Sequence, residues 1–202
     1  MNDWTIRPNV GLGRLRFGTT PAEVDQLTET YGAVNSRRSL APPVDVTEST
    51  IELLKHMLTE EQISSFREAS EAQRTSLSGL VQEIRGHGLQ LTYKNDRLDS
   101  LFAEWKTANI NFEGHYLFTS NPIPAFLALQ SANNAAPIVN DTDIYFANLH
   151  LGVYGFMDLN SNGRLVLREV ENERGGERSI IWGVDYAPGE DITPKYRPVV
   201  IE

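Results

Sequence analysis

The chain has 202 residues, of which 40% are hydrophobic and 22% are charged, as expected for a globular protein of one or two domains. Its 18 basic and 27 acidic residues give a net charge of −9. This charge disfavours binding to nucleic acid or anionic membranes, because such binding depends on Lys and Arg contacts to phosphate. The sequence contains no cysteine, which excludes disulfides, thiolate metal sites and cysteine nucleophiles.

The first residues, Met1 to Trp4, contain neither the basic nor the apolar part of a secretory signal. No window approaches the roughly 18 apolar residues of a membrane-spanning helix. We therefore expect a cytoplasmic protein that does not contact membrane or nucleic acid and whose partners are neutral or basic.

The first structural signal is an alternating segment at residues 13–19 that is followed by the start of a helix. Thr20 and Glu23 form a capping box around Pro21, which suits the first helical position. Gly32 is a typical residue for the end of that helix. The pattern predicts a strand followed by a short helix.

Residues 45–85 predict an inserted pair of helices. Residues 47–58 carry apolar side chains on one face, and a second capping box from Thr59 to Gln62 begins a long helix that is predicted to continue to Arg85. We expect this insertion to pack across the body as a helical arm.

The layout of the first strand and helix returns 101 residues later. Gly114 matches Gly13, and Asn121 matches Thr20 as the residue that caps the next helix. Each helix is followed by a hairpin signal, with turns expected at residues 95–96 and 162–163. The sequence thus predicts an α+β protein with two related strand-helix-antiparallel-hairpin units. The first covers residues 1–110 and includes the insertion at 45–85, and the second covers residues 111–202 with an extended C-terminal tail, both in one compact body.

A calcium-loop motif overlaps the second hairpin. Asp158, Asn160, Asn162 and Gly163, followed by Glu169, have the spacing of an EF-hand loop. The motif would supply oxygen ligands from Asp158, Asn160, Asn162 and Glu169. However, its flanks read as strands where an EF-hand requires helices, so we favour a hairpin turn and keep a small ligand- or calcium-binding module as the alternative.

The best candidate for an enzyme site is the pair Glu113 and His115, which lies near the end of a strand. No serine has the nucleophile-elbow pattern, and no two histidines have a metal-binding helical spacing. Polar residues beside a glycine in such a strand are more often only solvated. We therefore expect no catalytic residue, no cofactor and no enzyme activity, with Glu113 and His115 as the second alternative.

One face of the second unit is a candidate binding surface. Along residues 149–158, alternation places Leu149, Leu151, Val153 and Met157 on one side and three polar or aromatic residues on the other. Residues 180–184 are predicted to form a neighbouring strand. This face is either covered by another part of the chain or is an aromatic surface with an acidic rim, suited to a basic protein. The predicted partner-binding residues are His150, Tyr154, Phe156, Trp182, Asp141, Asp143, Glu169, Glu171 and Glu173.

The segment from Gly13 to Gly32, with "FGTTPAEV" and a closing "YG", resembles the repeat unit of the β-lactamase-inhibitory-protein-like fold. The matching residues are Gly18, Thr20, Glu23, Val24 and Gly32. The resemblance implies two such units in tandem, which agrees with the internal repeat. For an acidic, cysteine-free chain that is not exported, it implies a bacterial immunity protein.

The sequence therefore favours an immunity-type protein that binds and inhibits a cognate bacterial toxin or effector. The expected mechanism is occlusion of the toxin's active site by the sheet or the helical arm, with acidic side chains imitating phosphates if the toxin is a nuclease. Residues 1–44 carry a net charge of +1, residues 45–85 carry −4 and residues 86–202 carry −6. The acidic insertion and second unit are thus the expected docking surfaces for a basic toxin.

Overall fold

A computed structural model describes residues 3–107, 109–119, 121–140, 142–162, 164–168, 178–188, 196–199 and 201. Its main element is a nine-stranded sheet in which every neighbouring pair is antiparallel. The strands run in the order β16-β10-β11-β12-β15-β7-β6-β5-β4. Their bounds in chain order are β4 (Val34–Ser39), β5 (Leu80–Arg85), β6 (Gln90–Lys94), β7 (Arg97–Glu104), β10 (Ile138–Asn140), β11 (Asp143–Phe146), β12 (Leu151–Tyr154), β15 (Ser179–Gly183) and β16 (Arg197–Pro198).

The sheet joins the two halves of the chain at its centre. Strands β4 to β7 follow one another in space as they do in sequence, and so do β10, β11, β12 and β15. The last strand of each set pairs with the other, so that Leu101 of β7 lies opposite Trp182 of β15. The mixed helix and strand content confirms the predicted α+β class.

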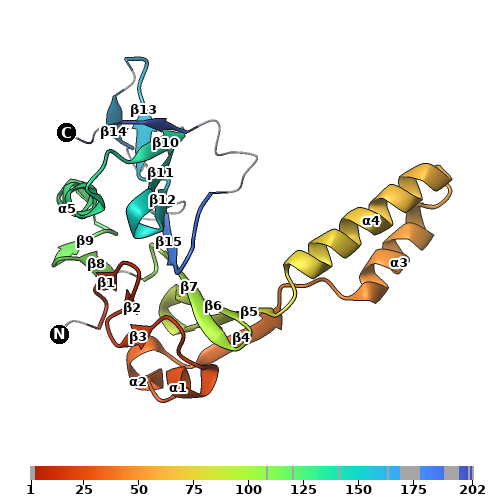
Figure 1. The fold of residues 1–202 in the computed structure, drawn as a ribbon. Coiled ribbons are helices and arrows are strands. Elements are labelled where there is room, and N and C mark those ends of the chain that lie inside the picture. The colour runs from red at the N-terminus through yellow and green to blue at the C-terminus, as the bar shows by residue number, and fades with distance from the viewer. Residues whose placement is uncertain are drawn as a thin grey trace.

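Small hairpins and short helices cover one face of this sheet (Figure 1). Trp182 donates its indole N–H to the carbonyl of Gly11 at 3.0 Å, which fixes the first hairpins against β15. The core also receives Val24, Tyr31 and Phe126 from the helices. The covering elements are β1 (Ile6–Arg7), β2 (Gly11–Leu12), β3 (Leu15–Arg16), α1 (Pro21–Asp25), α2 (Thr28–Tyr31), β8 (Asn111–Phe112), β9 (His115–Tyr116) and α5 (Ile123–Asn133). Single 3₁₀ turns occupy Gly86–Gly88 and Ala147–Leu149, and a separate hairpin consists of β13 (Met157–Leu159) and β14 (Leu165–Leu167).

The local helix and turn signals in the sequence are largely confirmed. Thr20 and Thr59 each accept a hydrogen bond from the third helical amide, and the reciprocal side-chain bond completes both capping boxes. Residues 95 and 96 form the predicted left-handed turn between β6 and β7, with φ of 51° and 58°. The cap of α5 is shifted by one residue: Pro122 is the N-cap, while the Asn121 side chain accepts the amide of Ile123 at 3.2 Å.

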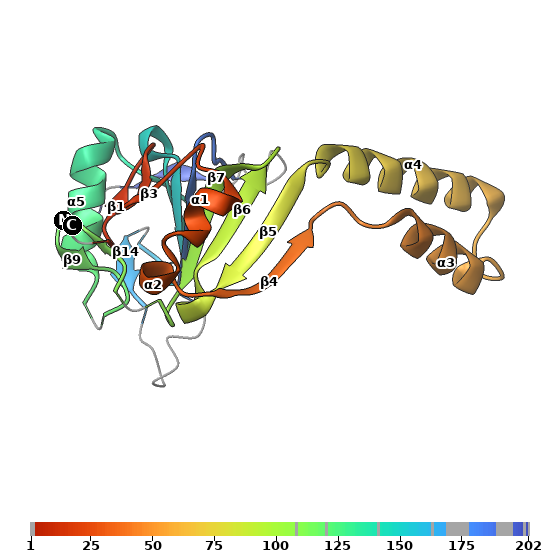
Figure 2. The ribbon, with the colours of Figure 1, turned by 90° about the horizontal axis from the view of Figure 1, so that it is seen from below.

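The insertion forms an arm that consists of α3 (Val44–Leu54) and α4 (Glu60–Ser76). The prediction that the second helix continues to Arg85 is wrong. Gly79 has a φ of 74°, a left-handed conformation that stops the helix, and the residues after it pair with β4 and β6 as β5. The expectation that the arm packs across the body is also wrong, since it projects from the end of the β4-β5 ribbon (Figures 1 and 2).

A buried ion network holds β5 against the first helix. Arg85 and Glu83 are both fully buried, and their Nε and Oε1 atoms lie 2.5 Å apart. Arg85 also pairs with Asp25 of α1 and donates to the carbonyl of Gly32 at 3.1 Å. Arg37 of β4 pairs with the second oxygen of Glu83. The two buried charges of this network, on Glu83 and Arg85, therefore each have a partner of opposite sign, which offsets the cost of their burial.

Replacing Arg85 with Met is expected to lower the free energy of unfolding by about 3–5 kcal/mol, because Glu83 would lose its only fully buried cation and keep only the partly exposed Arg37. Urea unfolding followed by circular dichroism measures this change. Lys106→Met, which removes the exposed ion pair with Glu104, is the matched control and should change stability by less than about 1 kcal/mol. Equal effects of the two substitutions would contradict the structural role of the network.

Candidate interaction surface

The second face of the long sheet has no helix packed on it among the described residues. Along β6, β7 and β15, buried residues alternate with half-exposed ones. Leu101 and Trp182 point into the core, so their strand neighbours Phe102 and Ile181 point to the opposite side. An antiparallel sheet commonly keeps one such face in contact with solvent. We call this surface, formed by the outward side chains of β5, β6, β7, β12 and β15, the open face.

A row of register partners runs along all nine strands of the sheet and passes through the open face. Phe102 and Ile181 lie side by side at its centre, and Gln90 and Ile84 continue the row toward β5. From one edge of the sheet to the other, the row contains Ser36, Ile84, Gln90, Phe102, Ile181, Gly152, Tyr145, Ile138 and Pro198. Its centre is apolar, and its side chains there are half-exposed.

Polar side chains border this apolar centre. On the side of the first unit, Arg38 donates two hydrogen bonds to the amide oxygen of Gln82, and Gln82 donates to Gln90 at 3.1 Å. The neighbouring row, which passes from β7 into the second unit, includes the carboxylates of Glu104 and Asp143. An apolar centre with a polar border is the usual composition of a protein-protein interface.

A tyrosine cluster covers the far end of the open face. Tyr145 donates its hydroxyl to the carbonyl of Tyr186 at 2.7 Å, and the hydroxyls of Tyr154 and Tyr186 share a hydrogen bond. The Nδ1 atom of His150 lies 3.3 Å from the same carbonyl. Burial raises the pKa of Tyr145, Tyr154, Tyr186 and Tyr196 above the ordinary value of tyrosine. These phenols therefore remain protonated hydrogen-bond donors at neutral pH.

Gly152 allows the ring of Tyr154 to lie flat on the sheet. A Cβ atom at Gly152 would come within 2.7 Å of the Tyr154 hydroxyl and 3.0 Å of its ring. Because Gly152 lies between Ile181 and Tyr145 in the central row, no side chain separates the tyrosine cluster from the apolar centre. The two parts form one continuous surface.

The residues predicted to bind a partner fall into three groups: some lie at the tyrosine cluster, some in the core, and some outside the described residues. His150, Tyr154 and Asp143 lie at the tyrosine cluster, with Tyr154 and Asp143 opposite each other in the sheet. The prediction for Phe156 and Trp182 is wrong, because both side chains are fully buried in the core. Asp141, Glu169, Glu171 and Glu173 lie outside the described residues.

The wrong assignment of Phe156 has a local cause. The predicted strand over residues 149–158 is interrupted at His150 and Gly155, whose φ values are 47° and 72°. The break shifts the alternation, so Phe156 turns inward and its ring meets that of Phe126 edge-on at 5.3 Å. Phe102 and Ile181, the centre of the open face, were not predicted from the sequence. Each has apolar neighbours in the chain, so no alternation of apolar and polar residues marks it as facing outward.

The calcium motif lies on a hairpin, as its flanking pattern predicts. Asp158 is opposite Val166 in the β13-β14 pair. The side-chain oxygen of Asn160 accepts the amides of Asn162 and Arg164 at 3.0 and 2.9 Å, so that oxygen already serves the turn. Gly163 and Glu169 lie outside the described residues, and the residues that are described contain no cluster of three or more metal-binding side chains.

The enzyme candidates Glu113 and His115 lie at the tip of the β8-β9 hairpin. Glu113 occupies the turn with a φ of 50°, and His115 is paired with Phe112. Both side chains are exposed. The hairpin therefore gives this pair none of the enclosure from water that acid-base catalysis usually requires.

The chain matches no known protein-family model, and no curated protein or solved structure is significantly similar to it. In the part of the chain that the structure describes, no helix combines the length and the hydrophobicity needed to cross a bilayer. The surfaces of the molecule are therefore the evidence for its function.

We expect stability to fall in alkaline solution because of the tyrosines. Six of them, Tyr31, Tyr93, Tyr145, Tyr154, Tyr186 and Tyr196, have a pKa raised mainly by burial. The folded state thus holds these protons more tightly than the unfolded state, and this stabilisation is complete below the unfolded pKa of about 10 and is lost as the pH rises above it. Urea unfolding across this range, with phenolate absorbance, tests the expectation; a free energy of unfolding that does not decrease above that pH would contradict it.

Calcium is expected to leave the melting temperature unchanged and to release no heat in calorimetry, because the motif lies on a hairpin whose Asn160 oxygen is already hydrogen-bonded. The informative control is Asp158→Asn. A calcium-dependent rise in melting temperature that Asp158→Asn abolishes would establish the metal loop instead.

Proposed function

We propose that this chain is an immunity-type protein, which binds a cognate bacterial toxin or effector and inhibits it by covering its active site. The observation that carries the proposal is the open face, a sheet surface with an apolar centre at Phe102 and Ile181 and a polar border. Such a surface can exclude water from a contact area and place aromatic anchors at its centre.

The arrangement of the strands supports the expected tandem repeat. Each half of the chain contributes four strands in sequence order, β4 to β7 and β10, β11, β12 and β15, which meet at the β7-β15 pair, and β16 is added at the edge of the second set. The hairpin pairs of Gly11 with Arg16 and of Asn111 with Tyr116 lie 100 residues apart, and each hairpin is followed by a helix on the core side. Two units joined in this way would produce one broad sheet, which is the surface that an occluding inhibitor requires.

Charge supports a basic partner. The whole chain carries −9, and the carboxylates of Glu104 and Asp143 lie in one row on the side of the sheet that includes the open face. Negative charge around an apolar contact accelerates association with a basic protein and disfavours acidic ones. A cytoplasmic toxin that acts on nucleic acid would have such a surface, because its substrate is a polyanion.

The test measures whether this chain binds the toxin-like protein encoded beside it in the genome and whether it inhibits that protein's activity. Phe102→Asp/Ile181→Asp should weaken binding at least about 30-fold and abolish inhibition, because it places charges at the apolar centre. Leu127→Asp, on the exposed side of α5, is the matched control and should bind like the unchanged chain.

Circular dichroism and the melting temperature establish that both variants are folded. Retention of full affinity by the double variant would exclude the open face as the binding surface. The absence of any toxin-like neighbouring gene, together with no tight protein partner captured from the source cells, would overturn the proposal as a whole.

A further inference from the structure

Helix α3 has apolar side chains on two faces. Ile51 is buried between α3 and α4, as expected for the inner face of a helical pair. On another face, Val46, Leu53 and Met57 are 53%, 72% and 71% exposed. Val46 and Leu53, seven residues apart, lie on one stripe of α3, and Met57 follows in the turn after the helix ends at Leu54. We call these three residues the outer stripe.

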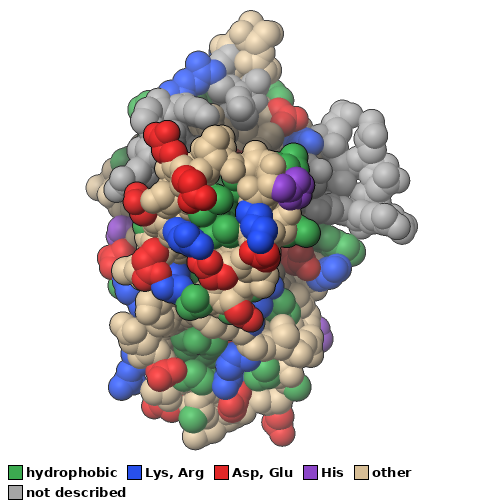
Figure 3. Space-filling view, turned by 90° about the vertical axis from the view of Figure 1, so that its right-hand side faces the viewer, with side chains coloured by type: hydrophobic (Ala, Val, Ile, Leu, Met, Phe, Trp, Pro, Cys, Tyr) green, Lys and Arg blue, Asp and Glu red, His purple; other side chains and the backbone are tan. Residues whose placement is uncertain are grey.

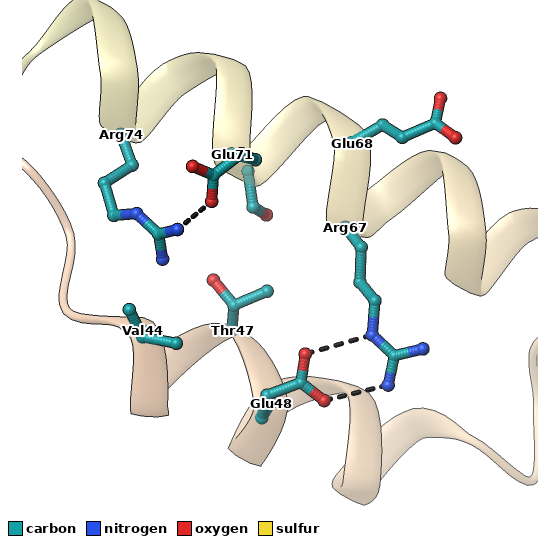
Figure 4. A pocket seen from close by; sticks show the side chains of 8 residues that line it. Val44, Thr47, Glu48, Arg67, Glu68, Glu71 and Arg74 are labelled. Carbon is teal, nitrogen blue, oxygen red and sulfur yellow. Dashed lines mark hydrogen bonds and ion pairs between the residues drawn. The ribbon is translucent and has the colours of Figure 1, made fainter.

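The arm has little internal packing of its own. Among its described residues only Ile51 of α3 and Ile63 of α4 are buried. Near its base the two helices are separated by a groove of about 320 Å³, whose lining includes Val44, Thr47 and Ser70 (Figure 4). Because short helices are marginal without tertiary contacts, a further contact would stabilise α3 substantially.

The charge of the arm indicates the kind of contact. Residues 44–76 contain seven acidic and three basic side chains, a net charge of −4. Each base is already paired within the arm: Lys55 with Glu52, Arg67 with Glu48, and Arg74 with Glu71. Figure 4 shows the last two of these pairs at the groove. The charge that remains to attract a partner is therefore negative.

With Glu48 and Glu52 paired in this way, the acidic side chains outside the three ion pairs are Asp45 on α3 and Glu60, Glu61 and Glu68 on α4. Figure 3, which views the molecule from the side on which the arm projects, shows hydrophobic side chains exposed among both acidic and basic ones. The complementary partner is a helix with an apolar stripe bordered by Lys or Arg.

We propose that the outer stripe of α3 binds a basic amphipathic helix of the partner protein, which packs on α3 as a third helix. This inference rests on the proposed function, because it describes a second contact with the same partner beside the open face. A second copy of this chain fits less well: its arm also carries −4, and α3 is only about 16 Å long, too short to bury the roughly 1,200 Å² of a stable dimer.

The probe is a synthetic helical peptide of about four turns, with Leu at the i, i+3, i+4 and i+7 positions and Lys elsewhere. A second peptide with Glu in place of Lys serves as its charge control. Fluorescence anisotropy with the full chain should show binding of the Lys peptide only. Val46→Gln/Leu53→Gln/Met57→Gln, which keeps good helix formers, should weaken this binding at least about tenfold.

The matched control is Leu127→Gln/Val166→Gln/Val184→Gln, which removes three exposed apolar side chains from the body and should leave binding unchanged. Equal binding of the Lys peptide to both triple variants would overturn the inference, since the attraction would then be charge alone. Failure of the Lys peptide to bind, or a dimer in sedimentation that the arm variant dissociates, would also overturn it.

The open-face variant Phe102→Asp/Ile181→Asp separates this inference from the proposed function. It should bind the Lys peptide like the unchanged chain, because the outer stripe is on a different element. If this variant loses toxin binding but still binds the peptide, the result bears on the open face alone and leaves the inference about α3 standing. Peptide binding that this variant also abolishes would show that the peptide uses the sheet and would contradict the role of α3.

Discussion

The helices of the body pack on the same face of a nine-stranded antiparallel sheet, and the remaining features of the molecule depend on this one-sided packing. Because side chains alternate along a strand, Leu101 and Trp182 belong to the core while their neighbours Phe102 and Ile181 face the other way. The hydrophobic effect that folds the chain therefore also leaves a second row of side chains on the other face, half-exposed at its centre, where Phe102 and Ile181 lie. Nothing in the described residues covers its central part except the tyrosine cluster at one end.

The buried Arg85–Glu83 pair holds β5, the strand that follows the arm, against the rest of the body. Both residues point into the core from β5, where Asp25 of α1 and Arg37 of β4 complete the network. Their neighbours on β5, Gln82 and Ile84, consequently face outward onto the open face. The same strand thus anchors the first helix, supplies the binding surface and begins where the arm ends. This explains how an insertion with so little internal packing can project from the edge of the sheet without disturbing the core.

Local signals in the sequence predicted local structure well. The capping boxes at Thr20 and Thr59 form as expected, since the hydrogen bonds involved join residues three apart. Longer-range features were harder to predict. A left-handed Gly79 converts an apparent helical seam into a strand, and that strand is stable only because β4 and β6 lie beside it. Likewise, Phe156 and Trp182 look suited to a binding surface, and only their tertiary contacts show that they belong to the core. The sequence around Ile181 and Trp182 is apolar throughout, so no pattern in it shows which of the two faces inward. The pairing of β15 with β7 shows it, because Trp182 lies opposite the core residue Leu101.

Hydroxyl-radical footprinting of the free chain tests most directly the claim that the sheet is packed on one face only. Aromatic and sulphur-containing side chains react when solvent reaches them, so Phe102 on the open face and Met57 on the arm should be labelled, while Phe156 and Trp182 should be protected until the chain unfolds. The account predicts that pattern in the native protein and uniform labelling in urea. Protection of Phe102 equal to that of Trp182 would contradict it, because the second face would then be covered as well.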